Sequence, residues 1–121
     1  MTMNPREKNY RMPAEWEKHA CCWMQWPHNN PEFNSYAEIS TWSHFDIEKG
    51  RIAWANVANA ISNFEQVKMI VHPDNIVNAS KLLNKRIEIL NFKNDDAWAR
   101  DSGAIFLLNK EKKLGGVDWE F

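Results

Sequence analysis

Three features are missing from this 121-residue sequence, and each absence excludes a class of protein. Basic residues show no excess, because 15 basic and 16 acidic side chains leave a formal charge of −1. That balance excludes the basic surface that non-specific nucleic-acid binding requires. No apolar run approaches the roughly 20 residues that span a bilayer, so we expect no membrane partner. The polar amino-terminal residues lack a signal-peptide core, and we expect a cytoplasmic protein.

Cysteine is scarce, and the two that occur, Cys21 and Cys22, are adjacent. Neighbouring residues of a strand point to opposite faces, so this pair provides no disulfide framework. No CxxC or histidine-rich spacing accompanies the pair, so no zinc site is expected. We interpret both as small apolar strand residues. The alternative, a reactive thiol, has no neighbour that would lower its pKa.

Tryptophan is abundant by contrast, with seven copies. Indole rings either fill a core or form the wall of a pocket for a flat cation, and composition leaves both open. The histidines have no metal-ligand spacing on a predicted helix, and we interpret them as structural or solvent-facing. They are His19, His28, His44 and His72.

Hydrophobic periodicity predicts an α/β protein with the element order β-α-β-α-β-β-β. The predicted strands are 20–26, 66–71, 86–92 and a hairpin of 104–108 with 114–120, and the predicted helices are 46–64 and 74–84. We expect Asp74 to cap the second helix. Residues 1–18 are predicted to be a polar lead-in and 93–103 a polar loop. The apolar stripe of the first helix is predicted to be Ile52, Trp54, Ala55, Val57, Ala58, Ile61 and Phe64.

The segment 94–103 gathers three carboxylates, one arginine and one tryptophan between two predicted strands. Loops at strand ends commonly carry functional side chains. A carboxylate can bind a guanidinium through two parallel hydrogen bonds, and an indole can cover the flat face of the cation. Arg100 could orient one of the carboxylates from behind. On chemistry alone, a solvated acidic turn with Trp98 in the core is the favoured interpretation.

Four blocks of the sequence, in the same order, resemble agmatine deiminases and their bacterial peptidylarginine deiminase relatives. They are Met12-Pro-Ala-Glu-Trp-Glu-Lys-His19 with Trp23-Met-Gln-Trp-Pro27, then Phe64-Glu-Gln-Val67, then Asn94-Asp-Asp-Ala-Trp-Ala-Arg-Asp101, and Val117-Asp-Trp-Glu-Phe121. The third block is similar to the family signature N-D-x-x-W-x-R-D. The resemblance implies the pentein fold, five α/β modules around a central active site. Residues 1–121 would form the amino-terminal part of a single deiminase domain, about the first module and part of the second.

The resemblance also implies roles for individual residues of this chain. Asp101 corresponds to the carboxylate that clamps the substrate guanidinium, and Trp98 to the aromatic residue beside it. Asp96 and Arg100 are expected to hold the loop. Trp119 is expected to lie at the approach to the pocket. The expected substrate-binding set is therefore Asp101, Trp98, Asp96 and Trp119.

The activity that the resemblance implies is hydrolysis of a C–N bond in an amidine. Agmatine would become N-carbamoylputrescine plus ammonia, a step of putrescine and polyamine biosynthesis. In the family, a cysteine thiolate attacks the guanidinium carbon and a histidine protonates the departing ammonia. Both are expected beyond Phe121, so no catalytic residue is expected within this chain, which we expect to be incomplete and inactive alone. No metal or organic cofactor is implied.

Other functions stay open at this point. One is deimination of peptidyl arginine, which is protein citrullination. Another is a non-catalytic small α/β protein that binds cations, a hypothesis that the tryptophan content and near-neutral charge support. A third is a decayed copy of the enzyme. The expected partner is a small guanidinium compound such as agmatine, and the parent protein could form a homo-oligomer.

Overall fold

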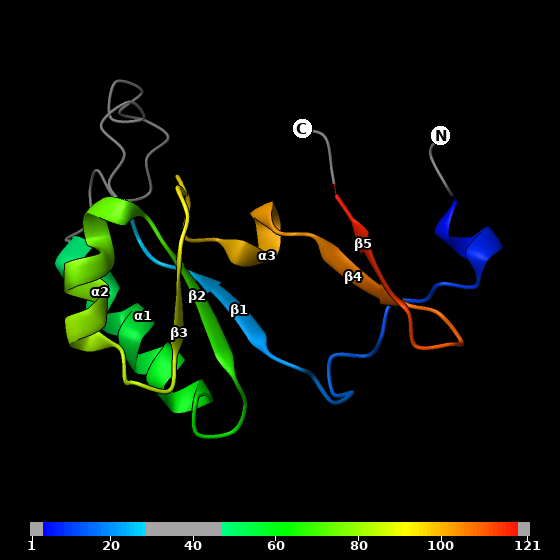
Figure 1. The fold of residues 1–121 in the computed structure, drawn as a ribbon, viewed down its shortest axis with the longest axis horizontal. Coiled ribbons are helices and arrows are strands. Elements are labelled where there is room, and N and C mark those ends of the chain that lie inside the picture. Colours follow the sequence, from blue (N-terminus) through cyan, green and yellow to red (C-terminus); the bar gives the residue numbers. More distant parts are fainter. Residues whose placement is uncertain (1–3, 29–46, 119–121) are drawn as a thin grey trace. The chain divides into compact units, whose positions relative to one another are not determined.

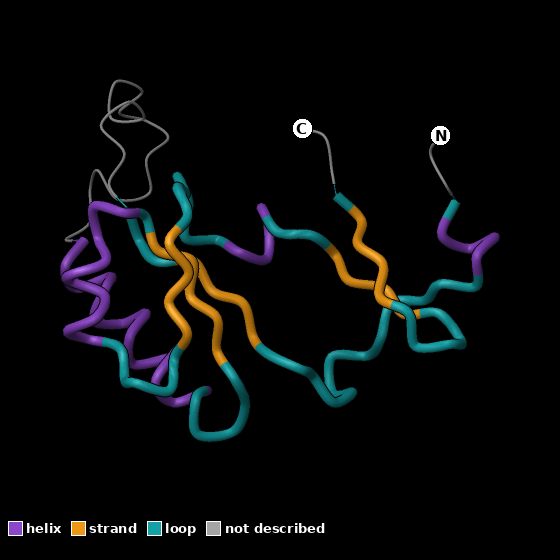
Figure 2. Tube along the Cα trace, in the orientation of Figure 1, coloured by secondary structure: helices purple, strands orange, loops and turns teal. Residues whose placement is uncertain are grey.

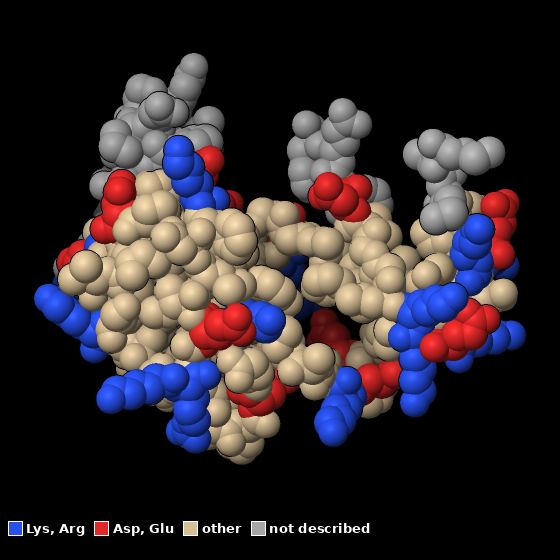
Figure 3. Space-filling model, viewed as in Figure 1, with Lys and Arg blue, Asp and Glu red and all other residues tan. Residues whose placement is uncertain are grey.

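A computed structural model of the protein describes residues 4–28 and 47–118. The chain divides into two compact units (Figure 1). The central unit is His19–Ala99, and the terminal unit combines Met1–Lys18 with Arg100–Phe121. Each unit has its own sheet. On the face drawn in Figure 3, both units carry basic and acidic side chains in mixture.

The central unit contains a parallel three-stranded sheet in the order β1-β2-β3. Its strands are β1 (Cys22–Gln25), β2 (Val67–Val71) and β3 (Glu88–Asn91), and its helices are α1 (Ile47–Ile61) and α2 (Ile76–Leu82). A short 3₁₀ turn, η3 (Pro73–Asn75), leads into α2. Parallel strands require crossover connections, and α2 supplies the one between β2 and β3. Both helices lie on the same side of the three strands (Figure 2).

The core of the central unit is centred on the middle strand, β2. Val67, Met69 and Val71 are completely buried, as the period of two in a strand requires of one face. Met69 stands opposite Met24 of β1 and Ile89 of β3 in the register of the sheet. Small residues of the helices pack against this face, which lets helix and sheet approach closely. They are Ala55, Ala58 and Ala79.

The terminal unit is built on an antiparallel hairpin of β4 (Ile105–Leu108) and β5 (Leu114–Val117). The amino-terminal segment joins it, because Arg11 and Leu108 exchange two backbone hydrogen bonds of 2.9 Å. The ring of Tyr10 lies over Gly115, where an added Cβ would stand 3.0 Å from the ring. A side chain at position 115 would therefore displace the tyrosine.

Most predicted elements are confirmed, and several details are wrong. The predicted lead-in contains the 3₁₀ turn η1 (Pro5–Lys8), and the predicted polar loop contains the one-turn helix α3 (Ala99–Ser102). Asp74 does not cap α2: its backbone N–H donates to the side chain of His72, which caps η3. The predicted second helix therefore begins as a 3₁₀ turn and becomes α-helical only at Ile76.

The buried face of the first helix has the predicted helical period, but some of the residues predicted to lie on it are exposed. The buried positions of α1 are 51, 55 and 58, at helical spacing, and Ser62 directly after the helix is also buried. Ile52 and Val57 are about half exposed, and Phe64, beyond the end of α1, is 90% exposed. A polar side chain, Arg51, takes the buried position that the apolar pattern gave to its neighbour Ile52.

Candidate functional site

Polar side chains gather where the three parallel strands of the central unit end. Trp26, Pro27 and His28 follow β1, His72 follows β2, and Asn94 lies in the loop after β3. Open parallel sheets bind ligands at the carboxyl ends of their strands. We call Trp26, Pro27, His28, Arg51, Asn75, Asn78 and Asn94 the strand-end cluster.

Trp26 and Pro27 form the base of the strand-end cluster. Trp26 is completely buried, and its backbone N–H still continues the sheet by donating to Ile70 over 2.8 Å. Its indole Nε1–H donates to Oδ1 of Asn78 on α2 over 2.9 Å. Proline has no N–H for a sheet, so Pro27 ends β1. Its carbonyl then becomes available as an acceptor for a side chain.

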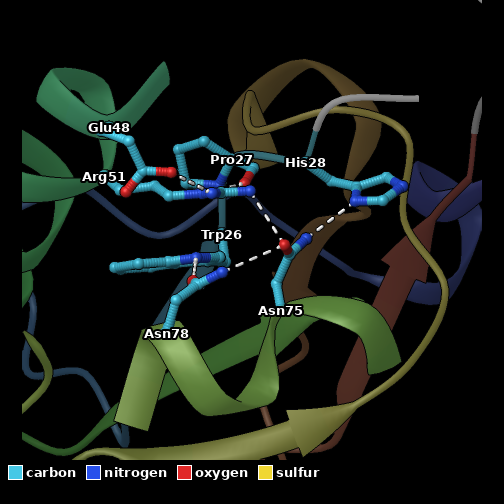
Figure 4. Close-up of polar contacts among 7 residues, drawn as sticks. All are labelled: Trp26, Pro27, His28, Glu48, Arg51, Asn75 and Asn78. Carbon is cyan, nitrogen blue, oxygen red and sulfur yellow. Dashed lines mark hydrogen bonds and ion pairs between the residues drawn. The ribbon is translucent and has the colours of Figure 1, made fainter. Parts of the chain in front are cut away.

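That side chain is Arg51 of α1, whose guanidinium is almost fully buried. Nε donates to the carbonyl of Pro27 over 3.2 Å, and Nη2 donates to Oδ1 of Asn75 over 2.8 Å (Figure 4). Nη1 pairs with Oε1 of Glu48 at 2.6 Å. A buried charge is costly unless it is paired and hydrogen-bonded, and Arg51 meets both conditions. Arg51 thereby ties together α1, the end of β1 and η3.

His28 is held against the same cluster. Its Nδ1 lies 2.7 Å from Nδ2 of Asn75, and its ring stacks on His72 at 3.9 Å between centroids with 6° between the planes. Oδ1 of Asn75 already accepts from Arg51 and Asn78, so Nδ2 donates to His28. Burial, followed by the charge of His72, lowers the pKa of His28 below its ordinary value. The neutral form of His28 is thus favoured.

Asn94 is the first residue of the signature segment, which is the block 94–101, and it fixes the first half of this segment to the strand-end cluster. Nδ2 of Asn94 donates to the backbone oxygen of Trp26 over 3.1 Å and to that of Asp96 over 3.0 Å. The side chain of Asp96 accepts the backbone N–H of Trp98 over 2.9 Å, a local turn typical of aspartate. The structure therefore brings Asp96 and Trp98 together.

The solvated-turn interpretation placed Trp98 in the core, but in the structure its indole is not enclosed there. It meets Trp54 of α1 edge to face, with ring centroids 5.6 Å apart and planes at 74°. Such a contact holds an aromatic ring in place. Trp98 nevertheless stays 45% exposed. A ring that is fixed at one edge and open elsewhere is suited to cover a flat cation.

The last two residues of the signature segment, Arg100 and Asp101, belong to the terminal unit. Asp101 lies on α3 and is exposed. Arg100 pairs with Glu15 at 2.9 Å rather than with a carboxylate of the loop, and both side chains are largely exposed. An exposed pair of this kind contributes about 0–1 kcal/mol. Trp119 and His44 lie outside the described residues.

The two cysteines are free and half-buried. Burial raises the pKa of the Cys22 thiol, which disfavours the nucleophilic thiolate. Within residues 4–28 and 47–118, no three His, Cys, Asp or Glu side chains are arranged to hold a metal ion. No helix in the same ranges has the length and apolar character to cross a membrane.

The sequence profile of the Porphyromonas-type peptidyl-arginine deiminase family matches residues 11–121. The chain belongs to this family. The four sequence blocks that predicted the relationship are thereby confirmed as a family resemblance.

Named relatives support the family and define the fold. A protein of Legionella pneumophila (strain Paris), named as a candidate agmatine deiminase, is 41% identical over 98% of this chain and 32% of its own length. A protein of Mycoplasma capricolum with the same name is 36% identical over 100% and 30%. The solved agmatine deiminase of Enterococcus faecalis has a TM-score of 0.74 at 30% identity, over 97% of this chain and 29% of that one.

The solved Enterococcus faecalis enzyme has the pentein fold, so the predicted fold class is confirmed. The chain spans about 30% of the length of the relatives that it matches. The parallel β-α-β-α-β arrangement of the central unit corresponds to part of the α/β architecture of these relatives.

Proposed function

We propose that the protein carrying this chain is a guanidine-modifying hydrolase that converts agmatine to N-carbamoylputrescine and ammonia. The observation that carries the proposal is Trp98, a half-exposed indole fixed within a family signature rich in carboxylates. Relatives with at least 30% identity that bear the name agmatine deiminase support this choice of substrate. The partner is accordingly a small guanidinium compound.

The roles that we propose within this chain are binding and positioning. Asp101, exposed on α3, is the carboxylate that clamps the guanidinium, and Trp98 covers its flat face. Asp96 holds the backbone of Trp98, and Trp119 is assigned to the approach of the pocket from the family pattern alone. Holding the guanidinium carbon in line for attack is a catalytic contribution in its own right.

The bond-breaking step is assigned to a cysteine and a histidine outside these 121 residues. A thiolate attacks the guanidinium carbon, ammonia leaves with the proton that the histidine donates, and water hydrolyses the covalent intermediate. Cys22 is a poor candidate for the nucleophile because burial raises its pKa. We place residues 1–121 in one deiminase domain of a cytoplasmic protein.

A second candidate substrate is peptidyl arginine, which the description of the matching family favours. Ammonia release by the whole protein, measured with agmatine and with a blocked arginyl peptide, separates the two. We expect release from agmatine. Faster ammonia release from the peptide would instead indicate protein citrullination as the function. Binding of agmatine without release from either compound would favour the cation-binding hypothesis.

The chain alone provides an independent check. We expect the 121 residues to release no ammonia from agmatine, because the nucleophile is assigned elsewhere. Ammonia produced by this chain, and abolished by Cys22→Ser, would contradict that assignment. It would require the thiol of Cys22 to act in spite of its raised pKa.

A further inference from the structure

We propose that Asn94 is a positioning residue, which holds Trp98 at the carboxyl end of β1 so that the indole can receive the substrate cation. The inference rests on the proposed function. Asn94 has 9% of its surface exposed, and its side chain faces two backbone carbonyls and not solvent. Its role is therefore exerted through the loop and not through contact with substrate.

The orientation of the Asn94 amide follows from its partners. Nδ2 has two acceptors, the carbonyls of Trp26 and Asp96, at 3.1 Å and 3.0 Å. The opposite orientation would place Oδ1 against two carbonyl oxygens, which is repulsive. Oδ1 is in consequence buried without a hydrogen-bond partner among the described residues. The unpaired oxygen costs desolvation free energy. The side chain of Asn94 therefore stabilises the loop only through the two hydrogen bonds that Nδ2 donates.

A continuous set of contacts leads from Asn94 to the indole. Asn94 fixes the end of β1 to the carbonyl of Asp96, and the carboxylate of Asp96 fixes the N–H of Trp98. Between residues 93 and 98 only Asn94 and Ala97 are buried, so few apolar contacts hold this part of the loop. Removing the Asn94 donors would detach the turn formed by Asp96 and Trp98 from the end of β1.

The sharpest test is Asn94→Asp in the whole protein, because aspartate keeps the shape of asparagine and removes both donors. Asn94→Ala removes the donors and the orphan oxygen without adding charge, and serves if the aspartate variant does not fold. Asn56→Asp is the matched control, since Asn56 is exposed on α1 and makes the same change of charge. Steady-state kinetics with agmatine and hydrogen exchange at the backbone amides of residues 95–98 are the two measurements.

We expect both Asn94 variants to exchange the loop amides faster than the wild type and to lose about 10- to 100-fold in kcat/KM, with a higher KM. The control is expected to match the wild type. A merely structural role would lower the folded fraction, and so the apparent kcat, at constant KM. Unchanged KM, or unchanged loop exchange, in both variants would overturn the inference.

The two proposals can fail separately. Absence of ammonia release from agmatine by the wild-type protein would remove the proposed function. Hydrogen exchange of the loop would still decide whether Asn94 fixes it. Faster exchange confined to residues 95–98 supports the positioning role. Exchange equal to that of Asn56→Asp contradicts it whatever the substrate.

Discussion

The strand-end cluster buries its polar and aromatic groups, whereas Trp98 and Asp101 of the signature segment leave theirs open to solvent. In the cluster, Arg51, Asn75 and Asn78 hydrogen-bond to other members, whereas Oδ1 of Asn94 has no partner among the described residues. In the signature segment, Trp98 is half exposed and Asp101 is exposed. Internally satisfied networks specify geometry, whereas open side chains remain available to a ligand. Substitution of Arg51 should therefore lower stability, and substitution of Asp101 or Trp98 should lower activity.

The largest expected effect is on activity, from Asp101→Asn in the whole protein. Loss of one clamp charge should lower kcat/KM for agmatine by at least about 100-fold. The thermal unfolding midpoint should stay unchanged, because Asp101 is exposed and its side chain has no partner among the described residues. The measurements are ammonia release and calorimetry on the same preparations. Wild-type activity in this variant would remove Asp101 from the site.

The largest expected effect on stability comes from Arg51→Met, which keeps the length of the side chain and removes every donor. The carbonyl of Pro27 and Oδ1 of Asn75 would each lose a bond, and we expect a loss of about 2–4 kcal/mol in the free energy of unfolding. Urea denaturation followed by tryptophan fluorescence measures it. Arg100→Met, which removes a mostly exposed pair with Glu15, is the control and should change little. Equal losses of unfolding free energy in the two variants would contradict the expected difference between the buried cluster and the exposed pair.

A smaller effect is expected from pH, through His28. Its pKa is lowered in the folded protein from the ordinary 6.5, first by burial and then by His72 and Arg51, against Asp74 and Asp95, which raise it. Below pH 6.5 the unfolded chain binds a proton that the folded chain resists, so stability falls as the pH drops through 6.5. His28→Gln should flatten this dependence between pH 7.5 and 5.5. An identical slope in the variant would assign the effect to another group.

The smallest effect is expected from an exposed pair in the terminal unit. Arg11 donates two hydrogen bonds to the carboxylate of Glu17, at 2.7 Å and 3.0 Å, which lowers the pKa of Glu17 to about 2. A lowered pKa stabilises the folded state above the ordinary value of 4.5, and this contribution is lost as the pH falls from 4.5 towards 2. Glu17→Gln should remove only that low-pH component, and acid titration of the unfolding midpoint would detect it.

The sequence was informative where periodicity or residue type carries a physical meaning. Hydrophobic periodicity predicted the strand 66–71, which is β2 in the structure, and the resemblance of residues 94–101 to the family signature singled out the segment that holds Trp98. Arg51 was missed because a charged helix residue is normally assigned to the solvent side. The one signal was its spacing of four from Ala55 and seven from Ala58.

Two amide residues of the cluster, Asn75 and Asn78, gave no comparable signal. They belong to a residue type that is common in turns, so nothing in the sequence distinguishes an anchor from a surface residue. Asn94 was recognised as the first residue of the family signature, but its anchoring contacts were not predicted. The capping role of Asp74 was predicted from its type and place, but His72 accepts its backbone N–H instead. Which of two neighbouring polar groups makes a hydrogen bond depends on tertiary geometry that local sequence does not contain.

The order of donors in the strand-end cluster has a consequence for the ring of His28. Arg51 gives hydrogen to Asn75, and Asn75 gives hydrogen to Nδ1 of His28, so the network has one direction. A neutral imidazole that accepts at one nitrogen must hold its proton on the other. Nε2 of His28 is then the protonated nitrogen. At its far edge, the ring offers a hydrogen-bond donor and not a lone pair, a polarity that is set by an arginine two hydrogen bonds away.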